Sequence, residues 1–412
     1  MLAIESRTMQ HSLKSKKTAG VAFSTLLMLL TIFGPVSMDL YLPVLPALTE
    51  DMHTTTSSAQ FTLTACLIGL ALGQIITGPL SDRYGRRMPV LIGVVAYSAA
   101  SLLCAFSPNI ITLVIARLVQ GLAGAAGIVI AQAAGRDVYE GGALIRYYGR
   151  LTVLGGLAAV VGPVIGGQLA RITDWHGIFI FLSIVGVVML AATLLIFGET
   201  LPVGRRTDGG MAQIGKDFRT LLSNRLFTGS VLIAGLTYAA LFAYLSGATY
   251  ILQETFGLSP QAYSIAFGTN SAGFMVFGYL GGVAAEHWSE QGSLTVGIAM
   301  TAIGSLGLLF TGLFSLPLPV VIASLFTLAS GVAFAAPATT SLSMADYPDL
   351  AGTASSILGC ARFGFGGFAA PLVGLGGSQA VLPLGIVTVG ATALAFLAQI
   401  MLVQRAGRER SL

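Results

Sequence analysis

Charged residues are scarce in this sequence: Asp, Glu, Lys and Arg make up 9% of the 412 residues, whereas they make up about 25% of an ordinary soluble domain. Hydrophobic residues make up 55%. A water-soluble globule of this length could not cover its surface with so few charges. Uncharged stretches such as 54–81 and 88–116 are long enough to cross a bilayer as helices. The composition therefore predicts an integral membrane protein.

Cysteine and histidine are also scarce, with 3 and 4 residues respectively. Cys66, Cys104 and Cys360 each lie inside an apolar run, which favours buried small side chains over a disulfide or a metal site. No histidine belongs to a metal-ligand pattern, so we expect no bound metal. The basic residues form no cluster with interleaved aromatic residues, which argues against nucleic acid as a partner.

The apolar runs can be divided at charges, at Pro/Gly clusters and at polar turns into twelve predicted transmembrane helices. Helices are expected because every backbone polar group in lipid must be satisfied within the protein. The expected limits of these helices, called spans 1 to 12 below, are residues 20–46, 57–80, 88–106, 110–133, 147–170, 177–198, 227–252, 260–285, 293–314, 317–341, 351–374 and 379–403. The predicted fold class is an all-α integral membrane protein.

The basic residues are distributed unequally between the two sides of these spans. Of the 21 Lys and Arg residues, Arg171 falls in an outer loop, and Arg117 and Arg362 fall within spans. All others lie in the two terminal segments or in the connections on the same side of the membrane as the termini. Because cytoplasmic loops are enriched in positive charge, both termini are expected in the cytoplasm. The expected parts are a cytoplasmic N-terminal segment (1–19), an N-terminal six-helix half (20–198), a cytoplasmic connecting loop (199–226), a C-terminal six-helix half (227–403) and a cytoplasmic tail (404–412).

The two halves show weak internal similarity. At an offset of about 205 residues, Gly78 in span 2 corresponds to Gly282 in span 8, and Arg117 in span 4 corresponds to Ser324 in span 10. Many secondary transporters are built from repeated halves, with the substrate site between them near the middle of the membrane. The pattern predicts two six-helix pseudo-repeat halves.

The most crowded charged stretch is GPLSDRYGRR, residues 78–87, between spans 2 and 3. A cytoplasmic turn held by positive charge would explain its arginines, but not the spacing of Gly78, Asp82 and Gly85. The stretch resembles the hallmark motif of the major facilitator superfamily. The resemblance implies a conformational latch between the halves that stabilises the outward-facing form, with the start of span 11 near 349–356 packed at the glycine. The expected latch residues are Gly78, Asp82, Arg83, Gly85, Arg86, Arg87 and Asp137.

Three further stretches agree with this resemblance. RLVQGLAGAAG, from Arg117, resembles the superfamily's motif in span 4, and MDLYLPVLPAL, from Met38, resembles the first-span motif of drug:proton antiporters, most closely of the Bcr/CflA type. GGLAAVVGPVIGG, residues 155–167, resembles the span 5 motif of antiporters. Proline kinks a helix and glycine permits close packing, so the antiporter interpretation of this last motif rests on the resemblance. Its residues are Gly155, Gly156, Gly162, Pro163, Gly166 and Gly167.

Two ionisable residues in the N-terminal spans are candidates for proton coupling. A carboxylate such as Asp39 costs roughly 2.5–3.5 kcal/mol inside a membrane, and such residues often belong to proton relays. The alternative is a polar residue near the outer end of span 1 that reaches water. Pro43 and Pro46 follow closely and are expected to interrupt the helix, which is consistent with a site that lines a cavity. Arg117 always carries its charge and needs a partner or a cavity. It could respond to the protonation of Asp39, or it could be a structural arginine bound by carbonyl groups, and both roles can hold together.

The substrate cavity is expected to be lined by aromatic side chains, which suit amphipathic organic molecules. Each aromatic residue taken singly could instead face lipid or pack in the core. Arg362 in span 11 could favour anionic or carbonyl-rich substrates, or it could neutralise a carboxylate across the cavity. The expected cavity residues are Tyr41, Tyr238, Phe242, Tyr244, Phe267, Asn270, Phe274 and Arg362.

The leading functional interpretation is a proton-coupled antiporter that exports small amphipathic drugs or toxic compounds by alternating access. An exporter of a sugar, amino acid or nucleoside would have the same fold and coupling. A non-transporting receptor or scaffold is an alternative of another class, although Asp39 and the span 5 motif would have no evident role in it. The expected location is the inner membrane of a bacterium.

We expect no enzymatic activity and no cofactor, with the proton gradient as the energy source. The stretch GMAQIGKD, residues 210–217, matches part of a phosphate-binding loop, but Asp217 stands where that loop needs Ser or Thr. The expected partners are a small-molecule substrate, protons and the lipid bilayer. The protein is expected to function as a monomer.

Overall fold

The computed structural model describes residues 20–139, 147, 150–151, 154, 161–206, 211–344, 351–374 and 381–404. Every regular element in these ranges is helical, which confirms the predicted all-α fold. The elements are α2 (Val21–Asp39), η1 (Leu42–Val44), α3 (Leu45–Asp51), α4 (Thr56–Tyr84), α5 (Arg87–Ala105), α6 (Ile110–Val138), α8 (Trp175–Ile196), η2 (Val203–Arg205), α9 (Met211–Ser223), α10 (Arg225–Tyr250), η3 (Ile251–Thr255), α11 (Pro260–His287), α12 (Glu290–Phe314), α13 (Leu318–Met344), α14 (Ala351–Gly374), α15 (Val381–Ala398) and η5 (Gln399–Gln404). Residues 161–169 are helical as well.

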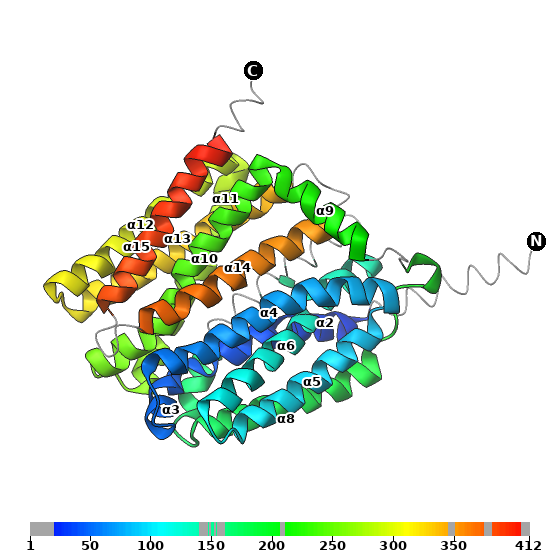
Figure 1. Ribbon diagram of the computed structural model, residues 1–412, viewed down its shortest axis with the longest axis horizontal. Helices are drawn as coiled ribbons and strands as arrows, with labels where there is room; N and C mark the ends of the chain where they lie inside the picture. Colours follow the sequence, from blue (N-terminus) through cyan, green and yellow to red (C-terminus); the bar gives the residue numbers. More distant parts are fainter. Residues whose placement is uncertain are drawn as a thin grey trace, which may run out of the picture.

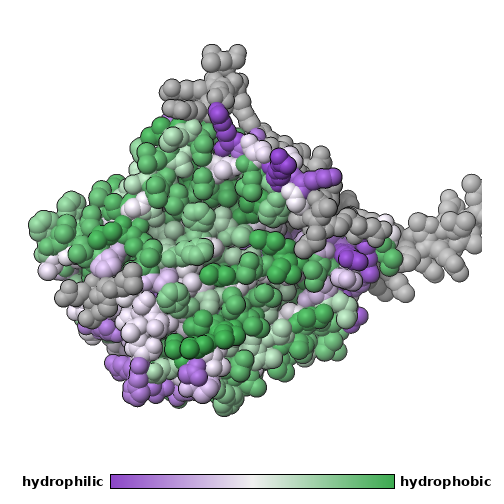
Figure 2. Space-filling view, viewed as in Figure 1, coloured by the Kyte–Doolittle hydropathy of each residue, from purple (hydrophilic) through white to green (hydrophobic). Residues whose placement is uncertain are grey.

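Ten helical segments of the described chain are long and apolar enough to cross a membrane. α11, with 28 residues, and the helical stretch 161–169 occupy the places predicted for spans 8 and 5. On the face shown in Figure 2, apolar side chains cover a broad band, and polar side chains gather toward two opposite ends. This surface suits a protein that spans a bilayer.

Polar caps determine where most of the long helices begin. In each case the side chain of the residue before the helix accepts a hydrogen bond from a backbone N–H in the first turn, which satisfies a donor that the helix itself leaves free. Such a cap is worth about 1 kcal/mol. The capping residues are Thr55, Asn109, Asp174, Asn224, Ser259 and Ser289.

The first span, expected over 20–46 with an interruption at its prolines, is broken within that range and continues to Asp51. α2 ends at Asp39, and the chain continues through the short 3₁₀ turn η1 into α3. Pro43 and Pro46 explain the interruption, because proline has no N–H to continue the helical hydrogen bonds. The break places Asp39 at a helix end inside the membrane-spanning part of the chain.

The helices form two groups that lie side by side (Figure 1). α2, α4, α5, α6 and α8 pack together in the N-terminal group, and α10 to α15 pack together in the C-terminal group. The two groups meet most extensively along α4 and α14. Gly374 lies against Gln60 and Gly359 lies against Gln74, so these two helices run antiparallel.

Glycines allow the closest helix crossing inside the N-terminal group. A Cβ atom at Gly69 of α4 would overlap the carbonyl oxygen of Leu118, and a Cβ atom at Gly121 of α6 would overlap the carbonyl oxygen of Cys66. The backbones of α4 and α6 therefore touch, a packing mode that small residues permit in membrane proteins. This crossing fixes α6, which carries Arg117, against α4.

Hydrogen bonds join the two groups at one end of the molecule, the end at which α3 lies. We call it the α3 end, and the opposite end, where α2 begins and η5 finishes, the terminal end (Figure 1). All the side chains involved are neutral. The bonds are Thr49 Oγ1 to Tyr250 Oη (2.7 Å), Tyr250 Oη to the Leu45 carbonyl (3.5 Å), Gln253 Nε2 to the Pro43 carbonyl (3.0 Å), Gln60 Nε2 to the Ser246 carbonyl (3.3 Å) and Gln261 Nε2 to the Gly167 carbonyl (3.2 Å).

Candidate functional site

Asp39 carries the one carboxylate that lies away from the two ends within the described membrane-spanning segments. It is the last residue of α2 and is half-buried. Among the residues that the structure describes, no side chain forms a hydrogen bond or an ion pair with it. An unpaired carboxylate inside a membrane protein marks a candidate functional site.

Glycines of the expected antiporter motif make room for the end of α2. A Cβ atom at Gly162 would lie 2.7 Å from the Cβ atom of Asp39, and one at Gly166 would overlap the carbonyl oxygen of Leu40. Gly167 faces the C-terminal group instead, where an added Cβ would overlap the side chain of Ser264 in α11. The motif therefore lets the helical stretch 161–169 approach both α2 and α11 near Asp39. Gly155 and Gly156 lie outside the described residues, and no specific contact of Pro163 enters this packing.

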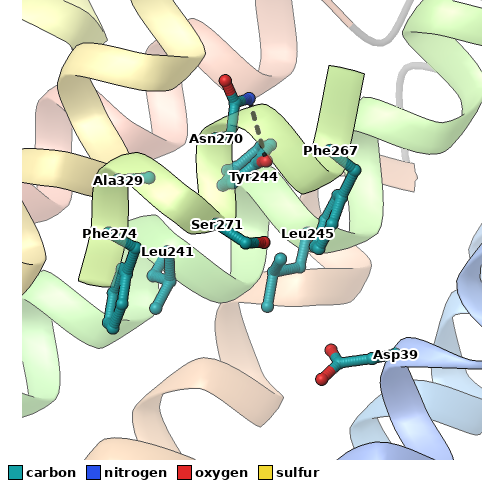
Figure 3. A pocket seen from close by; sticks show the side chains of 9 residues that line it. All are labelled: Asp39, Leu241, Tyr244, Leu245, Phe267, Asn270, Ser271, Phe274 and Ala329. Atoms are coloured by element: carbon teal, nitrogen blue, oxygen red, sulfur yellow. Dashed lines mark hydrogen bonds between the residues drawn. The ribbon is translucent and has the colours of Figure 1, made fainter. Parts of the chain in front are cut away.

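A cavity of about 80 Å³ opens between Asp39 and the C-terminal group. Figure 3 shows the Asp39 carboxylate pointing across a gap toward residues of α10 and α11. The lining residues are Asp39, Leu241, Tyr244, Leu245, Phe267, Asn270, Ser271, Phe274 and Ala329. The cavity is smaller than the roughly 300–1,000 Å³ typical of drug-sized ligand sites, so this conformation has room for water or a small group only.

The polar part of the lining on the C-terminal side is small. Asn270 Nδ2 donates a hydrogen bond to Tyr244 Oη at 3.1 Å. The Oδ1 atom of Asn270 is buried and finds no donor among the described residues. The cavity therefore combines an apolar wall with the bonded pair Asn270–Tyr244 and a free carboxylate on Asp39, the few polar groups that orient a ligand in an apolar pocket.

Four of the expected cavity residues lie in this lining: Tyr244, Phe267, Asn270 and Phe274. Sequence reasoning missed Leu241, Leu245, Ser271 and Ala329. Helical spacing could have found three of them. Positions 241, 244 and 245 share one face of α10, and positions 267, 270, 271 and 274 share one face of α11.

Tyr41 does not face the cavity but packs inside the N-terminal group. Its side chain is fully buried, and its hydroxyl lies 3.0 Å from Thr62 Oγ1. The guanidinium of Arg117 lies 4.9 Å from the centre of the Tyr41 ring and 5.5 Å from that of Phe179. Two aromatic faces thus enclose the arginine, an arrangement that cation–π attraction favours where water is excluded.

Arg117 is held by the N-terminal group alone in this conformation. It is 0% exposed, and its Nη1 donates a hydrogen bond of 2.6 Å to Gln120 Oε1. Gln120 Nε2 in turn donates to Ser101 Oγ at 2.7 Å. The Nε and Nη2 atoms of Arg117 have no acceptor in the described chain, and no described contact links Arg117 to Asp39. Coupling between these two residues stays a prediction.

Tyr238, Phe242 and Arg362 form a separate group in the C-terminal half. The Arg362 guanidinium lies 5.0 Å from the centre of the Tyr238 ring, and its Nη2 donates to Thr340 Oγ1 at 2.9 Å. Phe242 packs against Phe363, with ring centres 5.9 Å apart. The structure therefore divides the expected cavity residues among three places.

The turn between α4 and α5 holds a buried ionic cluster around Arg86. Arg86 Nη1 lies 2.6 Å from Asp82 Oδ1 and Nε lies 3.0 Å from Asp137 Oδ2, with Arg86 3% and Asp137 4% exposed. Arg86 Nη1 also donates to Ser81 Oγ at 2.6 Å. Although burial opposes the charge, the two carboxylates hold the pKa of Arg86 above its usual value. The cluster ties α4 to α6.

Glu199, which follows α8, completes this cluster, and sequence reasoning missed it. Its Oε1 accepts the backbone N–H of Arg86 at 2.8 Å, and Oε2 accepts that of Arg87 at 3.4 Å. Gly85 has a φ of +88°, and a Cβ atom there would overlap the Glu199 carboxylate. The available signal was a lone carboxylate at the end of span 6. Arg86 and Arg87 lie more than 110 residues from Glu199 in the sequence, so only the folded chain reveals these contacts.

The described contacts of the expected latch lie within the N-terminal group. Arg83 is exposed beside Tyr84, and Arg87 Nη2 donates to the Leu194 carbonyl at 3.2 Å. No described atom lies within 4 Å of a Cβ atom placed on Gly78. The start of span 11 was expected there, but residues 345–350 lie outside the described ranges. A latch function between the halves stays a prediction.

Residues that could hold a metal ion do not gather in this site. Within the described ranges, no group of three His, Cys, Asp or Glu side chains is placed to bind a metal. The site instead presents one free carboxylate to an apolar cavity between two helix groups.

Comparison with known proteins identifies relatives over most of the chain. Residues 27–371 match the sequence model of the Major Facilitator Superfamily. An uncharacterized MFS-type transporter, YdgK of Bacillus subtilis, is 36% identical, covering 92% of this chain and 94% of the relative. The bicyclomycin resistance protein homolog of Haemophilus influenzae is 27% identical over 84% of this chain and 87% of the relative. Multidrug resistance protein D of Escherichia coli is 28% identical over 84% and 86%.

Solved structures show a similar fold. A bacterial homolog of the human lysosomal transporter Spinster, in an inward-facing and unoccupied conformation, matches with a TM-score of 0.74 and 16% identity, covering 92% of this chain and 97% of the other. The nucleoside transporter NupG matches with a TM-score of 0.73 and 13% identity, covering 92% and 99%. Together with the family match, these similarities confirm the predicted membrane transporter fold.

Proposed function

The chain belongs to the Major Facilitator Superfamily, and we propose that it is a proton-coupled antiporter that exports small amphipathic compounds by alternating access. It is a multi-pass membrane protein of a transporter family, so a small-molecule substrate is its general partner. We place it in the inner membrane of a bacterium, as a monomer with both termini in the cytoplasm. The distribution of Lys and Arg supports this orientation.

Asp39 is the observation that carries the proposed proton coupling. Its carboxylate faces the cavity between the two helix groups and has no partner among the described residues. A carboxyl group in this place can hold a proton, or in its ionised form it can accept a donor group of the substrate. Because it cannot do both at once, substrate entry would release the proton, and proton entry would release the substrate. Intramembrane carboxylates serve proton relays in this way.

The cavity wall supports an amphipathic substrate. Leu241, Leu245, Phe267 and Phe274 supply apolar surface, whereas Asn270 and Tyr244 supply a small polar pair. Such a mixture suits organic molecules with one polar end. The names of the relatives from Haemophilus influenzae and Escherichia coli, which refer to bicyclomycin resistance and multidrug resistance, support export of toxic compounds.

The hydrogen bonds at the α3 end support alternating access. In the proposed orientation this end faces outward, so the described conformation is closed to the outside. Breaking these bonds would let the two groups separate at the α3 end and open the Asp39 cavity to the periplasm. The antiparallel contact of α4 and α14 would act as the line about which the groups rock.

Proton release on substrate binding tests the coupling. Lightly buffered, detergent-purified protein is mixed with compounds that it exports in an efflux-deficient bacterium, and released protons are followed with a pH dye. We expect release from the native protein and none from Asp39→Asn. Glu50→Gln is the matched control, because Glu50 is an exposed carboxylate on nearby α3. Undiminished release from Asp39→Asn would overturn the proposal.

A further inference from the structure

Arg362 is a second intramembrane charge that the proposed proton exchange does not use. It lies in α14 and is half-buried. Its Nη2 is bound to Thr340, and its Nε is enclosed without an acceptor among the described residues. No carboxylate of the described chain forms an ion pair with it. The side chain therefore does not neutralise an acid across the cavity in the described part of the structure.

The charges inside the membrane-spanning segments do not balance. Away from the α3 end and the terminal end, the described membrane-spanning segments place two guanidinium groups, Arg117 and Arg362, against the single carboxylate of Asp39. Cations inside a membrane protein are costly unless they meet an anion or water. An anionic ligand would restore the balance.

The two arginines differ in access to a ligand. Arg117 is 0% exposed and lies between the rings of Tyr41 and Phe179, so nothing can approach it without unpacking the N-terminal group. Arg362 keeps one exposed side, and its Nη1 has no hydrogen-bond partner among the described residues. The ring of Tyr238 and the hydroxyl of Thr340 hold its guanidinium in place. A ligand can therefore reach only the second arginine.

Arg362 lies on the terminal side of the Asp39 cavity. Tyr238, beneath its guanidinium, is one turn before the cavity residue Leu241 on α10, which runs from the terminal end toward the α3 end. Thr340 is about three turns beyond the cavity residue Ala329 on α13, which runs toward the terminal end. In the proposed orientation, a compound from the cytoplasm would pass Arg362 before it reached Asp39.

The surroundings of Arg362 suit a molecule with an apolar body. The Tyr238 and Phe242 rings lie 6.2 Å apart, and the Phe242 and Phe363 rings lie 5.9 Å apart, so three aromatic side chains form a continuous row beside the guanidinium. Aromatic surface binds the apolar part of a ligand, whereas the planar fork of arginine matches the two oxygens of a carboxylate.

We propose that Arg362, held on the ring of Tyr238, forms an anion subsite on the path to the Asp39 cavity, and that the exported compounds are amphipathic molecules that carry a carboxylate. This inference rests on the proposed export function for its biological meaning. The subsite itself binds its ligand without a proton gradient. Once the substrate carboxylate has met Arg362, its apolar body can extend along the aromatic row toward the cavity.

Matched probes test the subsite by equilibrium binding. Isothermal titration calorimetry of the detergent-purified full chain would compare 2-naphthylacetate, 2-naphthylacetamide and (2-naphthylmethyl)trimethylammonium. We expect the carboxylate to bind about tenfold more tightly than the amide, because a hydrogen bond between charged groups is stronger by a free energy that corresponds to this ratio. The ammonium compound should bind most weakly. Equal binding of the three probes, or no measurable binding of the carboxylate, would overturn the proposal.

Variants identify the residue responsible. Arg362→Gln is expected to remove the preference for the carboxylate while leaving the affinity for the amide within about twofold, which also shows that the variant is folded. Arg362→Lys should keep part of the preference, because it keeps the charge but loses the planar fork. Arg171→Gln is the matched control, since it removes the same charge from an exposed loop, and it should change nothing. A preference that survives Arg362→Gln, or equal losses for all three probes, would contradict the assignment.

The Asp39→Asn variant separates this inference from proton coupling. The carboxylate preference should persist in that variant, because Arg362 and Asp39 lie at different depths. If the preference is present but no proton is released by the native protein, the proposed coupling fails and the anion subsite stands. If protons are released but the preference is absent, the subsite fails alone.

Discussion

The connection after α4 and its counterpart after α11 use charge in different ways. After α4, the almost fully buried guanidinium of Arg86 bonds to Asp82 and Asp137. After α11, the side chains of His287 and Glu290 form hydrogen bonds only in exposed positions. The first connection is therefore an ionic cluster that ties helices together, whereas the second is a solvated turn.

The same contrast recurs within the membrane. In the repeat of the two halves, Arg117 of α6 corresponds to Ser324 of α13 in the C-terminal group. Gly304 and Gly307 of α12 pack so closely on Ser324 that a Cβ atom on either glycine would meet α13. The N-terminal group thus encloses a cation where the C-terminal group has close contact between small residues.

The cavity divides its residues in the same way. Apart from Asp39, every lining residue belongs to α10, α11 or α13 of the C-terminal group. The N-terminal group supplies the carboxylate and the charged clusters that hold its helices, and the C-terminal group supplies the apolar wall. We therefore expect substitutions in the two halves to have different consequences, with the N-terminal half more sensitive to changes of charge.

The largest difference should appear on removing the charges of the two connections. Arg86→Ala is expected to lower the free energy of unfolding by about 3–5 kcal/mol, because Asp137 would remain buried without its cation. Glu286→Ala, in an exposed position of the second connection, should change it by less than about 0.5 kcal/mol. Thermal unfolding of both purified variants in detergent measures the effect. Similar losses of stability in the two variants would show that the two connections do not differ in their use of charge.

A smaller difference should appear at two glycines with positive φ. Alanine at either Gly85 (φ +88°) or Gly257 (φ +69°) is strained by about 1–3 kcal/mol, because only glycine adopts such φ values readily. At Gly85 the new methyl group would also displace the Glu199 carboxylate, whereas at Gly257 no atom lies within 4 Å. We expect Gly85→Ala to lower the melting temperature clearly more than Gly257→Ala. A larger loss at Gly257 would show that the Glu199 contact adds no stability.

The smallest difference concerns how helices begin. Asp174 caps α8 in the N-terminal group, whereas serines cap α11 and α12. Although its slight burial acts in the opposite direction, the Gly177 N–H and the neighbouring His176 hold the pKa of Asp174 below its usual value. The stabilisation is therefore complete above the ordinary value of about 3.9 and is lost as the pH falls through the lower folded-state value.

Trp175, the first residue of α8, reports on this cap. In a Trp288→Phe background, its fluorescence should show earlier thermal unfolding at pH 3 than at pH 5, by an amount that corresponds to about 1 kcal/mol or less. Asp174→Ser should reduce this dependence on pH, because serine has no charge to lose. An unchanged dependence in that variant would mean that other carboxylates cause it.

The sequence predicted the helical class and the order of the apolar segments because both follow from hydropathy and chain length. It also placed Arg86 and Asp137 in one expected latch, and the structure joins the two in an ion pair. The contact with Glu199 could not be predicted in this way, because it depends on how the end of α8 packs against the turn between α4 and α5. Pro43 and Pro46 were expected to interrupt the first span, whereas the end of α2 at Asp39 itself was not given by the sequence.

The cavity was predicted in part. Phe267, Asn270 and Phe274 were expected, and they share one helix face. Tyr41 was expected there as well, but it lies two positions after Asp39 and packs in the interior of the N-terminal group. Composition tells which side chains can line a cavity, whereas the rotation of each helix about its axis determines which of them do. That rotation depends on packing contacts such as the one between Gly69 and Leu118, which a single sequence does not reveal.

The closure of the α3 end has an energetic consequence. Its hydrogen bonds join neutral groups such as Thr49, Gln60 and Tyr250, and each net contribution is about 0.5–1.5 kcal/mol. None of these hydrogen bonds involves a charged group, and together they contribute only a few kcal/mol. One elementary charge that moves through 100 mV releases about 2.3 kcal/mol. Under the proposed coupling, the passage of one or two protons would therefore supply a free energy comparable to that of the hydrogen bonds that close the α3 end.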